Sequence, residues 1–132
     1  MTSTRFQDYA VQSRFAYLDT AGFSLSGFQS NTVGPAIFED RVTYKKELRF
    51  LERFNVELRL GGQSEDGKHF IMANRITKPD GEVCCEVRSR AAWFDLRARK
   101  LTAPPEALKF AMDALARTDD FETLKPNGTP PP

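Results

Sequence analysis

The sequence predicts an α+β domain in which one long helix packs on a curved antiparallel sheet and a short second helix lies near the C-terminus. Apolar residues first recur with the 3.6-residue period of a helix, over residues 3–21. The period then changes to two through residues 38–96, in four segments joined by short polar turns, as is typical of antiparallel neighbours. A length of 132 residues fits one domain, so both layers are expected to share one core.

The long helix is expected over residues 3–21. Its apolar face is formed by residues spaced three and four apart, and Gly22 then suits the left-handed conformation that often ends helices. The predicted inward positions are Phe6, Tyr9, Ala10, Ser13 and Tyr17. The polar side chains expected elsewhere on the helix are Gln7, Asp8, Gln12, Arg14 and Asp19. Residues 23–35, rich in Ser, Thr and Gly, are expected to form a connecting loop.

Four strands are expected over residues 38–48, 54–60, 69–77 and 82–96. The second shows strict alternation of apolar and polar residues, which predicts one buried and one exposed face. Residues 78–81, Lys-Pro-Asp-Gly, predict a tight turn because proline presets φ and glycine accepts a positive φ. Such short connections make consecutive strands antiparallel neighbours.

The C-terminal part predicts a second helix and then a tail. Pro104 and Pro105 suit a first helical turn, and the narrow apolar stripe of Leu108, Met112 and Leu115 predicts a short, peripheral helix. Apolar residues then become sparse. We therefore assign residues 1–118 to the domain and residues 119–132 to a flexible, proline-rich tail.

Composition excludes several classes of protein. Nineteen Lys and Arg against eighteen Asp and Glu leave a formal net charge of +1, too little to hold nucleic acid or an anionic membrane through charge alone. No run approaches the ~18 apolar residues of a membrane span, and the first ten residues are too polar for a signal peptide. Two adjacent cysteines fit neither a disulfide framework nor a zinc site. A cytoplasmic protein without metal or cofactor is expected.

Few side chains indicate chemistry by themselves. His69 is the only histidine and follows a polar turn, so a surface position at a strand end is favoured over a general base. Cys84 and Cys85 should point to opposite faces of a strand and are favoured as small apolar residues over nucleophiles. The charges at 97, 99 and 100 are either solvated or an anchor for the phosphates of a nucleotide-bearing substrate.

Three parts of the chain carry a family resemblance, in the expected order. Residues 4–9 and 13–18, followed by 22–23, look like a central helix; residues 42–48 look like the strand after it; and residues 92–96 with 99–105 look like a last strand and its exit. Together they resemble the hot-dog-fold acyl-CoA thioesterase family, similar to 4-hydroxybenzoyl-CoA thioesterase, over about residues 1–124. The resemblance implies a hot-dog fold and a homodimer or homotetramer with sites at subunit interfaces.

The chain departs from that family at its start. Members usually begin with a strand that ends in an acidic residue and a Gly-His turn, and the acid attacks or activates water. This sequence starts at Met1, directly after the position of that turn. We expect Met1 to be an internal methionine of a longer protein; the alternative is a reduced variant of the fold.

The resemblance also implies a site. Backbone N–H groups at the helix start would polarise the thioester carbonyl, so the catalytic candidates are Ser3, Thr4 and Asp8. For either hydroxyl a helix cap is the favoured role, and for Asp8 a solvated position is favoured over catalysis. The acyl chain would lie between helix and sheet, and coenzyme A phosphates would meet surface cations. The expected substrate-binding residues are Phe6, Tyr9, Tyr44, Arg97, Arg99 and Lys100.

Two functions therefore compete. The first is an acyl-CoA thioesterase that releases a free acid and coenzyme A. The second is a noncatalytic module of the same fold that binds acyl-CoA or an acyl carrier. A cone-shaped ligand binder or isomerase shares the helix and strands but usually has more than one helix before its sheet. A hot-dog dehydratase is disfavoured because it needs a histidine near the helix, whereas His69 is in a strand.

Overall fold

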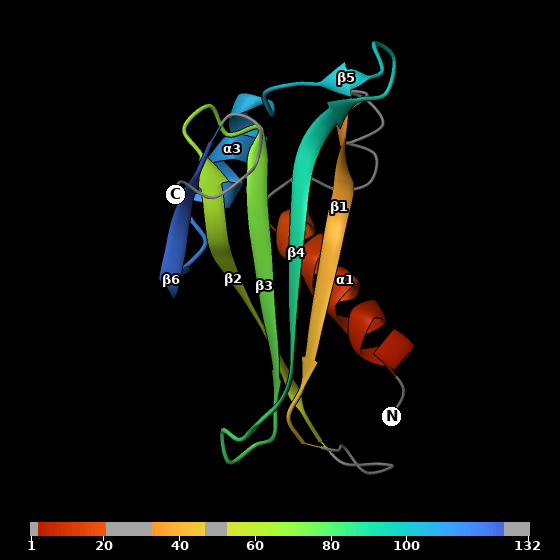
Figure 1. The fold of residues 1–132 in the computed structure, drawn as a ribbon, viewed down its shortest axis with the longest axis vertical. Coiled ribbons are helices and arrows are strands. Elements are labelled where there is room, and N and C mark those ends of the chain that lie inside the picture. Colours follow the sequence, from red (N-terminus) through yellow and green to blue (C-terminus); the bar gives the residue numbers. More distant parts are fainter. Residues whose placement is uncertain (1–2, 21–32, 47–52, 126–132) are drawn as a thin grey trace.

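The structure, a computed structural model, describes residues 3–20, 33–46 and 53–125. Within these ranges a long helix lies across one face of a six-stranded sheet, and a short helix packs near one end (Figure 1). The sheet order is β1-β4-β3-β2-β6, and β5 pairs with β4. The elements are α1 (Ser3–Thr20), β1 (Val33–Tyr44), β2 (Asn55–Ser64), β3 (His69–Thr77), β4 (Val83–Asp95), β5 (Lys100–Leu101), α3 (Glu106–Asp113) and β6 (Arg117–Leu124).

The long helix and the four expected strands are confirmed, with displaced boundaries: β1 ends at Tyr44 rather than at residue 48, and β2 continues to Ser64 rather than ending at residue 60. Strand β1 begins at Val33 rather than at residue 38, and it contains Pro35. Proline is tolerated there because β1 is an edge strand, where a missing N–H need not break the ladder. A bulge between Ile37 and Glu39 shifts the pairing with β4. Gly22 and most of the expected loop lie outside the described residues.

The predicted tail from residue 119 is wrong in its first part. Residues 117–124 form β6, which pairs with β2 in parallel, so the sheet is not wholly antiparallel. Leu124 is buried at the end of β6, and the backbone N–H of Leu60 donates to the carbonyl of Ala116 at 2.8 Å. Composition gave little signal because only alternate side chains of this edge strand face the protein. Residues 126–132 lie outside the described residues.

The second helix exists as predicted, but it is not peripheral. Leu108 and Met112 have no exposed surface, and Ala111 is buried beside them. The hydroxyl of Tyr17 on α1 donates to the carbonyl of Ala111 at 2.6 Å, which ties the two helices together. A narrow apolar stripe is therefore enough to close one end of the core.

The interface between α1 and the sheet holds two apolar clusters with a polar layer between them. The Trp93 cluster includes Leu18, Leu60, Phe70, Met72, Ala91, Trp93 and the buried residues of α3. The Cys85 cluster comprises Ala10, Ile76, Cys84, Cys85 and Val87. The polar layer between them consists of Ser13, Arg14, Asn74 and Ser89. Asn74 on β3 and Ser89 on β4 lie on the same face of the sheet as the apolar strand residues of the two clusters.

The buried face of α1 differs from the predicted one at its centre. Ala10 is buried as expected, and Tyr9, Ser13 and Tyr17 are half-buried. Arg14, expected on the polar side, is only 8% exposed. It sits four residues after Ala10 and so shares its face, and the polar layer supplies the partner that its charge needs.

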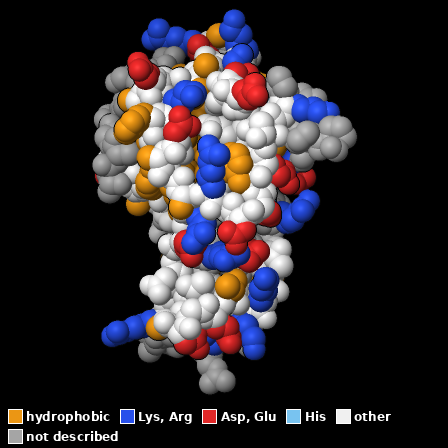
Figure 2. Space-filling view, turned by 90° about the vertical axis from the view of Figure 1, so that its left-hand side faces the viewer, with side chains coloured by type: hydrophobic (Ala, Val, Ile, Leu, Met, Phe, Trp, Pro, Cys, Tyr) orange, Lys and Arg blue, Asp and Glu red, His pale blue; other side chains and the backbone are white. Residues whose placement is uncertain are grey.

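The two edges of the sheet differ in character. On β1, the exposed fraction is 48% for Ile37, 60% for Phe38 and 50% for Tyr44. On β6, Arg117, Asp119 and Asp120 are exposed, and the view from that side shows basic and acidic side chains interspersed (Figure 2). Charged edge strands resist pairing with another chain, whereas apolar ones favour it. The β1 edge thus combines three exposed large apolar side chains with a run of three exposed charged ones, Glu39, Asp40 and Arg41.

The single histidine is not at the surface, contrary to the prediction. His69 is 3% exposed, and neither ring nitrogen has a hydrogen-bond partner in the described part of the chain. Its ring lies 6.3 Å from that of Phe38, centroid to centroid. The side chain thus fills space next to β1 and offers no geometry for proton transfer.

The cysteines are structural, as expected. Both are buried and neither forms a disulfide in the described part of the chain, and burial raises the pKa of the Cys85 thiol to about 11, which makes it a poor nucleophile. A register shift between Ile76 and Thr77 passes over Cys84 in the pairing of β4 with β3, although its carbonyl accepts from the backbone N–H groups of Lys45 and Lys46. Both thiols join one cluster instead of two faces. The cytoplasmic location stays a prediction.

Candidate functional site

An apolar pocket of about 240 Å³ lies between α1 and the sheet, beside the β1 edge. We call it the α1 pocket. Its volume exceeds the roughly 150 Å³ of an engineered protein cavity that takes up benzene, so it has room for a substituted ring or a medium acyl chain. Its walls include Val11, Phe15 and Leu18 of α1, Ile37 of β1, Met72 of β3 and Trp93 of β4.

The polar layer forms one end of this pocket. Arg14 and Ser89 both line it. The Nε of Arg14 donates to Oδ1 of Asn74 at 2.8 Å, while the Asn74 amide donates to the hydroxyl of Ser13 at 2.8 Å. The Ser89 hydroxyl donates to a carboxylate oxygen of Asp40 on β1. The layer thus presents fixed polar groups at the end of an otherwise apolar space.

One atom of that layer is unsatisfied. The Nη2 of Arg14 is buried and has no hydrogen-bond partner in the part of the chain that the structure describes. Burial lowers the pKa of Arg14, and the negative charge of Asp40 opposes that shift. Because a guanidinium starts far above neutral pH, Arg14 remains charged and keeps its donors.

The predicted catalytic residues lie at the start of α1. The helix begins at Ser3, so residues 3–6 supply the unpaired backbone N–H groups expected there. The side chains of Ser3, Thr4 and Phe6 lie outside what the structure describes. Asp8 is exposed and does not line the α1 pocket. Catalytic roles for Ser3, Thr4 and Asp8 stay predictions.

The two tyrosines expected to bind substrate do not line the α1 pocket. Tyr9 packs on Phe54 with ring centroids 4.8 Å apart, against the Cys85 cluster. Its described contacts are therefore those of a core residue. Tyr44 is half-exposed at the far end of β1.

The three basic candidates lie where β4 leads into β5: Arg97 and Arg99 in the connection and Lys100 at the first position of β5. Arg97, Arg99 and Lys100 are all exposed, and Arg99 has a φ of 54° that tightens the turn. Asp95 shapes it: hydrogen bonds from the backbone N–H groups of Ala98 and Arg97 lower the pKa of the Asp95 carboxyl. We call this turn the basic hairpin.

Within one chain, the basic hairpin and the start of α1 lie at opposite ends of the molecule (Figure 1). The start of α1 packs beside the Cys85 cluster, and Cys85 pairs with Tyr44 in the sheet. The other end of α1 reaches the Trp93 cluster, close to the pairing of Val33 with Asp95. Eighteen helical residues at about 1.5 Å each separate the two ends by roughly 27 Å. The structure does not bring these predicted elements together in a single subunit.

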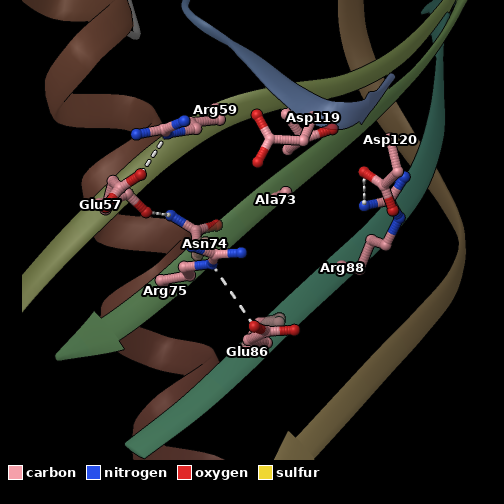
Figure 3. A pocket seen from close by; sticks show the side chains of 11 residues that line it. Glu57, Arg59, Ala73, Asn74, Arg75, Glu86, Arg88, Asp119 and Asp120 are labelled. Carbon is pink, nitrogen blue, oxygen red and sulfur yellow. Dashed lines mark hydrogen bonds and ion pairs between the residues drawn. The ribbon is translucent and has the colours of Figure 1, made fainter. Parts of the chain in front are cut away.

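A second pocket, of about 160 Å³, lies on the other face of the sheet (Figure 3). Six of its seven charged side chains are already paired with one another, the seventh being Asp119. Arg59 contacts Glu57, Arg75 lies 3.4 Å from Glu86, and Arg88 lies 3.4 Å from Asp120. A ligand would have to displace these pairs, so we favour the α1 pocket as the site. We call this second one the outer pocket.

The described residues contain neither a metal-binding group of side chains nor a helix able to span a membrane. Among the described residues, no three or more His, Cys, Asp or Glu side chains are grouped so as to hold a metal ion. No helix in the same ranges is long and apolar enough to cross a membrane.

Sequence reasoning missed the polar end of the pocket. Arg14 was placed with the solvated residues because of its charge, although its spacing from Ala10 and Leu18 put it on the buried face. Asn74 and Ser89 lie inside strands at inward positions of the alternation. Their polar character at inward positions is the sequence signal that indicates a polar end of the pocket, because a buried polar group needs a buried partner.

A long helix across a curved sheet, with an apolar pocket beneath it, defines a hot-dog fold. The chain belongs to the thioesterase-like superfamily, whose sequence profile matches residues 1–112. Comparison with curated proteins gives no significant match.

Solved structures support the same fold. A hypothetical protein from Staphylococcus aureus, determined in complex with CoA, has a TM-score of 0.77 and 19% identity over 86% of this chain and 70% of its own. A 1,4-dihydroxy-2-naphthoyl-CoA thioesterase from Synechocystis has a TM-score of 0.76 and 14% identity, over 87% and 84% of the two chains. A gentisyl-coenzyme A thioesterase has a TM-score of 0.71 and 18% identity, over 86% of each.

Proposed function

We propose that this protein hydrolyses an acyl-CoA thioester to a free acid and coenzyme A, with the acyl group held in the α1 pocket. The observation that carries the proposal is the pocket: it is apolar and lies under the helix of a thioesterase-like fold. The structural neighbours that bind CoA or cleave aryl-CoA esters support the same ligand class. Each buried CH₂ of an acyl chain would add about 0.8 kcal/mol to binding.

The proposed chemistry uses the start of α1. Water attacks the carbonyl carbon of the thioester, and the backbone N–H groups of residues 3–6 stabilise the negative charge that develops on its oxygen. The carbon–sulfur bond then breaks, and coenzyme A leaves as a thiolate that takes up a proton. Ser3 and Thr4 act through their backbone in this proposal, and Asp8 is the candidate base that accepts the proton of water.

A second candidate, binding without cleavage, is favoured by one observation. No carboxylate lines the α1 pocket in the described part of the chain. A module that holds acyl-CoA or an acyl carrier would need the pocket but no base. The two candidates differ in turnover and share the same ligand, so one experiment separates them.

We further propose that the protein is a homodimer joined through β1. The β1 edge is twelve residues long and exposes three large apolar side chains beside the charged residues 39–41, whereas the β6 edge exposes no large apolar side chain. Two copies paired antiparallel along β1 would bury Ile37, Phe38 and Tyr44 and extend the sheet across the dimer. The α1 pocket lies beside the same edge, so the partner would close its open side.

The two-fold symmetry of such a dimer would also bring together predicted site residues that lie far apart in one chain. Antiparallel pairing of β1 brings the Tyr44 end of one copy next to the Val33 end of the other. The α1 start of one subunit would then approach the basic hairpin and the α1 pocket of its partner. Phosphate contacts from Arg97, Arg99 and Lys100 would thus be made across the interface.

The test of the proposed function is a panel of acetyl-, hexanoyl-, octanoyl-, benzoyl- and palmitoyl-CoA, with released thiol and bound ligand both measured. We expect turnover of the hexanoyl, octanoyl or benzoyl ester, because these groups match the pocket in size. Cys84 and Cys85 are buried, so the protein itself adds little thiol signal. Binding without turnover would select the second candidate, and absence of both binding and turnover would contradict both.

A further inference from the structure

The unpaired nitrogen of Arg14 indicates what the far end of the bound acyl group is made of. Arg14 is 92% buried, since 8% of it is exposed, and it lines the α1 pocket. Its Nε is used by Asn74, while its Nη2 is buried with no partner among the described residues. A buried, charged donor without an acceptor is unfavourable in the empty protein. A ligand atom that accepts this hydrogen bond would remove that cost.

We propose that Arg14 selects acyl groups that carry a hydroxyl near their far end over groups that end in a methyl. The inference rests on the proposed function, because it assumes that the acyl group occupies the α1 pocket. Apolar walls alone would favour the acyl group that ends in a methyl. The polar end of the pocket is what reverses the preference.

Ser89 and Asp40 specify a hydroxyl rather than a carboxylate. The hydroxyl hydrogen of Ser89 is donated to Asp40, so the Ser89 oxygen keeps acceptor capacity toward the pocket that it lines. Because Arg14 and Ser89 line the same pocket, a ligand hydroxyl that comes between them would accept from the guanidinium of Arg14 and donate to Ser89. A carboxylate could only accept, and it would meet the negative charge of Asp40, which already interacts with Arg14.

The length of the pocket limits where the hydroxyl sits. Along the wall formed by α1, Arg14 lies four residues from Leu18, which is roughly 6 Å of helix at 1.5 Å per residue, and Val11 lies almost one turn further on. Trp93 and Leu18 belong to the end near the basic hairpin, and Arg14 and Ser89 to the end at the polar layer. An acyl group that enters from the hairpin end would reach Arg14 with its last atoms.

The test compares two ligands of equal size. Thioether analogues of 6-hydroxyhexanoyl-CoA and heptanoyl-CoA, in which a methylene separates sulfur from the carbonyl, cannot be hydrolysed and differ only by a terminal OH against CH₃. Isothermal titration of the full chain should give a dissociation constant roughly tenfold to hundredfold lower for the hydroxyl analogue, the range of a hydrogen bond to a charged group. Arg14→Met should abolish or reverse this preference.

Two further variants control for folding and for charge. Arg75→Met makes the same chemical change on the other face of the sheet, where Arg75 is exposed and 3.4 Å from Glu86, and it should keep the wild-type preference. Arg14→Lys retains the charge and should keep part of the preference even if Arg14→Met unfolds. Equal binding of both analogues to the wild type, or a preference that survives in Arg14→Met, would overturn this inference and leave the proposed function standing. Binding of neither analogue would overturn the inference together with the proposed function.

Discussion

Trp93→Ala is expected to lower the free energy of unfolding by about 3–5 kcal/mol, the typical cost of truncating a buried tryptophan. Trp93 is 1% exposed and is the largest fully buried side chain among the described residues. Its ring stacks on Phe70 with centroids 4.8 Å apart. It also forms part of the wall of the α1 pocket, so its loss would enlarge the pocket and weaken the core at once.

Urea denaturation followed by circular dichroism measures this effect without relying on tryptophan fluorescence. A loss of about 3–5 kcal/mol is a large share of the 5–15 kcal/mol that a domain usually has. Leu96→Ala is the matched control, because Leu96 directly follows β4 and is 60% exposed, and it should change stability by less than about 0.5 kcal/mol. A loss below about 1 kcal/mol for Trp93→Ala would contradict the described core.

Phe38→Lys is expected to convert the dimer into monomers. Phe38 is 60% exposed and lies at the middle of the twelve residues of β1. In an antiparallel pair about a two-fold axis, the middle of the strand meets its own copy, so one substitution acts twice. Two lysines would then face each other, where like charges in cross-strand positions are destabilising, and burial of two phenyl rings would be lost.

Analytical ultracentrifugation over a range of protein concentrations measures the change. The wild type should sediment as a dimer, and Phe38→Lys should shift the dissociation constant upward by at least about a hundredfold, since burial of each large apolar side chain is worth about 1.5–3 kcal/mol. Phe110→Lys tests for a nonspecific effect of charge, because Phe110 is 76% exposed on α3 and lies away from β1. A monomeric wild type, or equal dissociation of both variants, would rule out the β1 interface.

The fold followed from the sequence wherever periodicity and turn residues agreed. The α1 pattern and the Lys-Pro-Asp-Gly turn located the long helix and the β3–β4 connection correctly. The sequence did not reveal β6, because a strand at a sheet edge needs few apolar residues and pairs through its backbone. Nor did it reveal that α3 is central to the core, since burial of Leu108 and Met112 depends on what packs above them.

The site was predicted only in part for a similar reason. The space between helix and sheet was expected, and the α1 pocket lies there. Arg14 was assigned to solvent because charge is a good guide to exposure unless a partner is buried with it, and Asn74 is sixty residues away in the sequence. The basic hairpin and the α1 start were both expected to contribute to the site, but one chain separates them, and in our proposal a partner subunit joins them.

The central claim is that an acyl group binds in the α1 pocket, and a pair of matched substitutions tests it most directly. Ala91 lines the α1 pocket and is 4% exposed, whereas Ala73, on the neighbouring strand β3, lines the outer pocket. Titration with a thioether analogue of octanoyl-CoA should give a dissociation constant at least about tenfold higher for Ala91→Leu, because the added side chain fills space that the acyl chain needs. Ala73→Leu should bind like the wild type. Unchanged binding by Ala91→Leu, in a variant that unfolds cooperatively like the wild type, would contradict the claim.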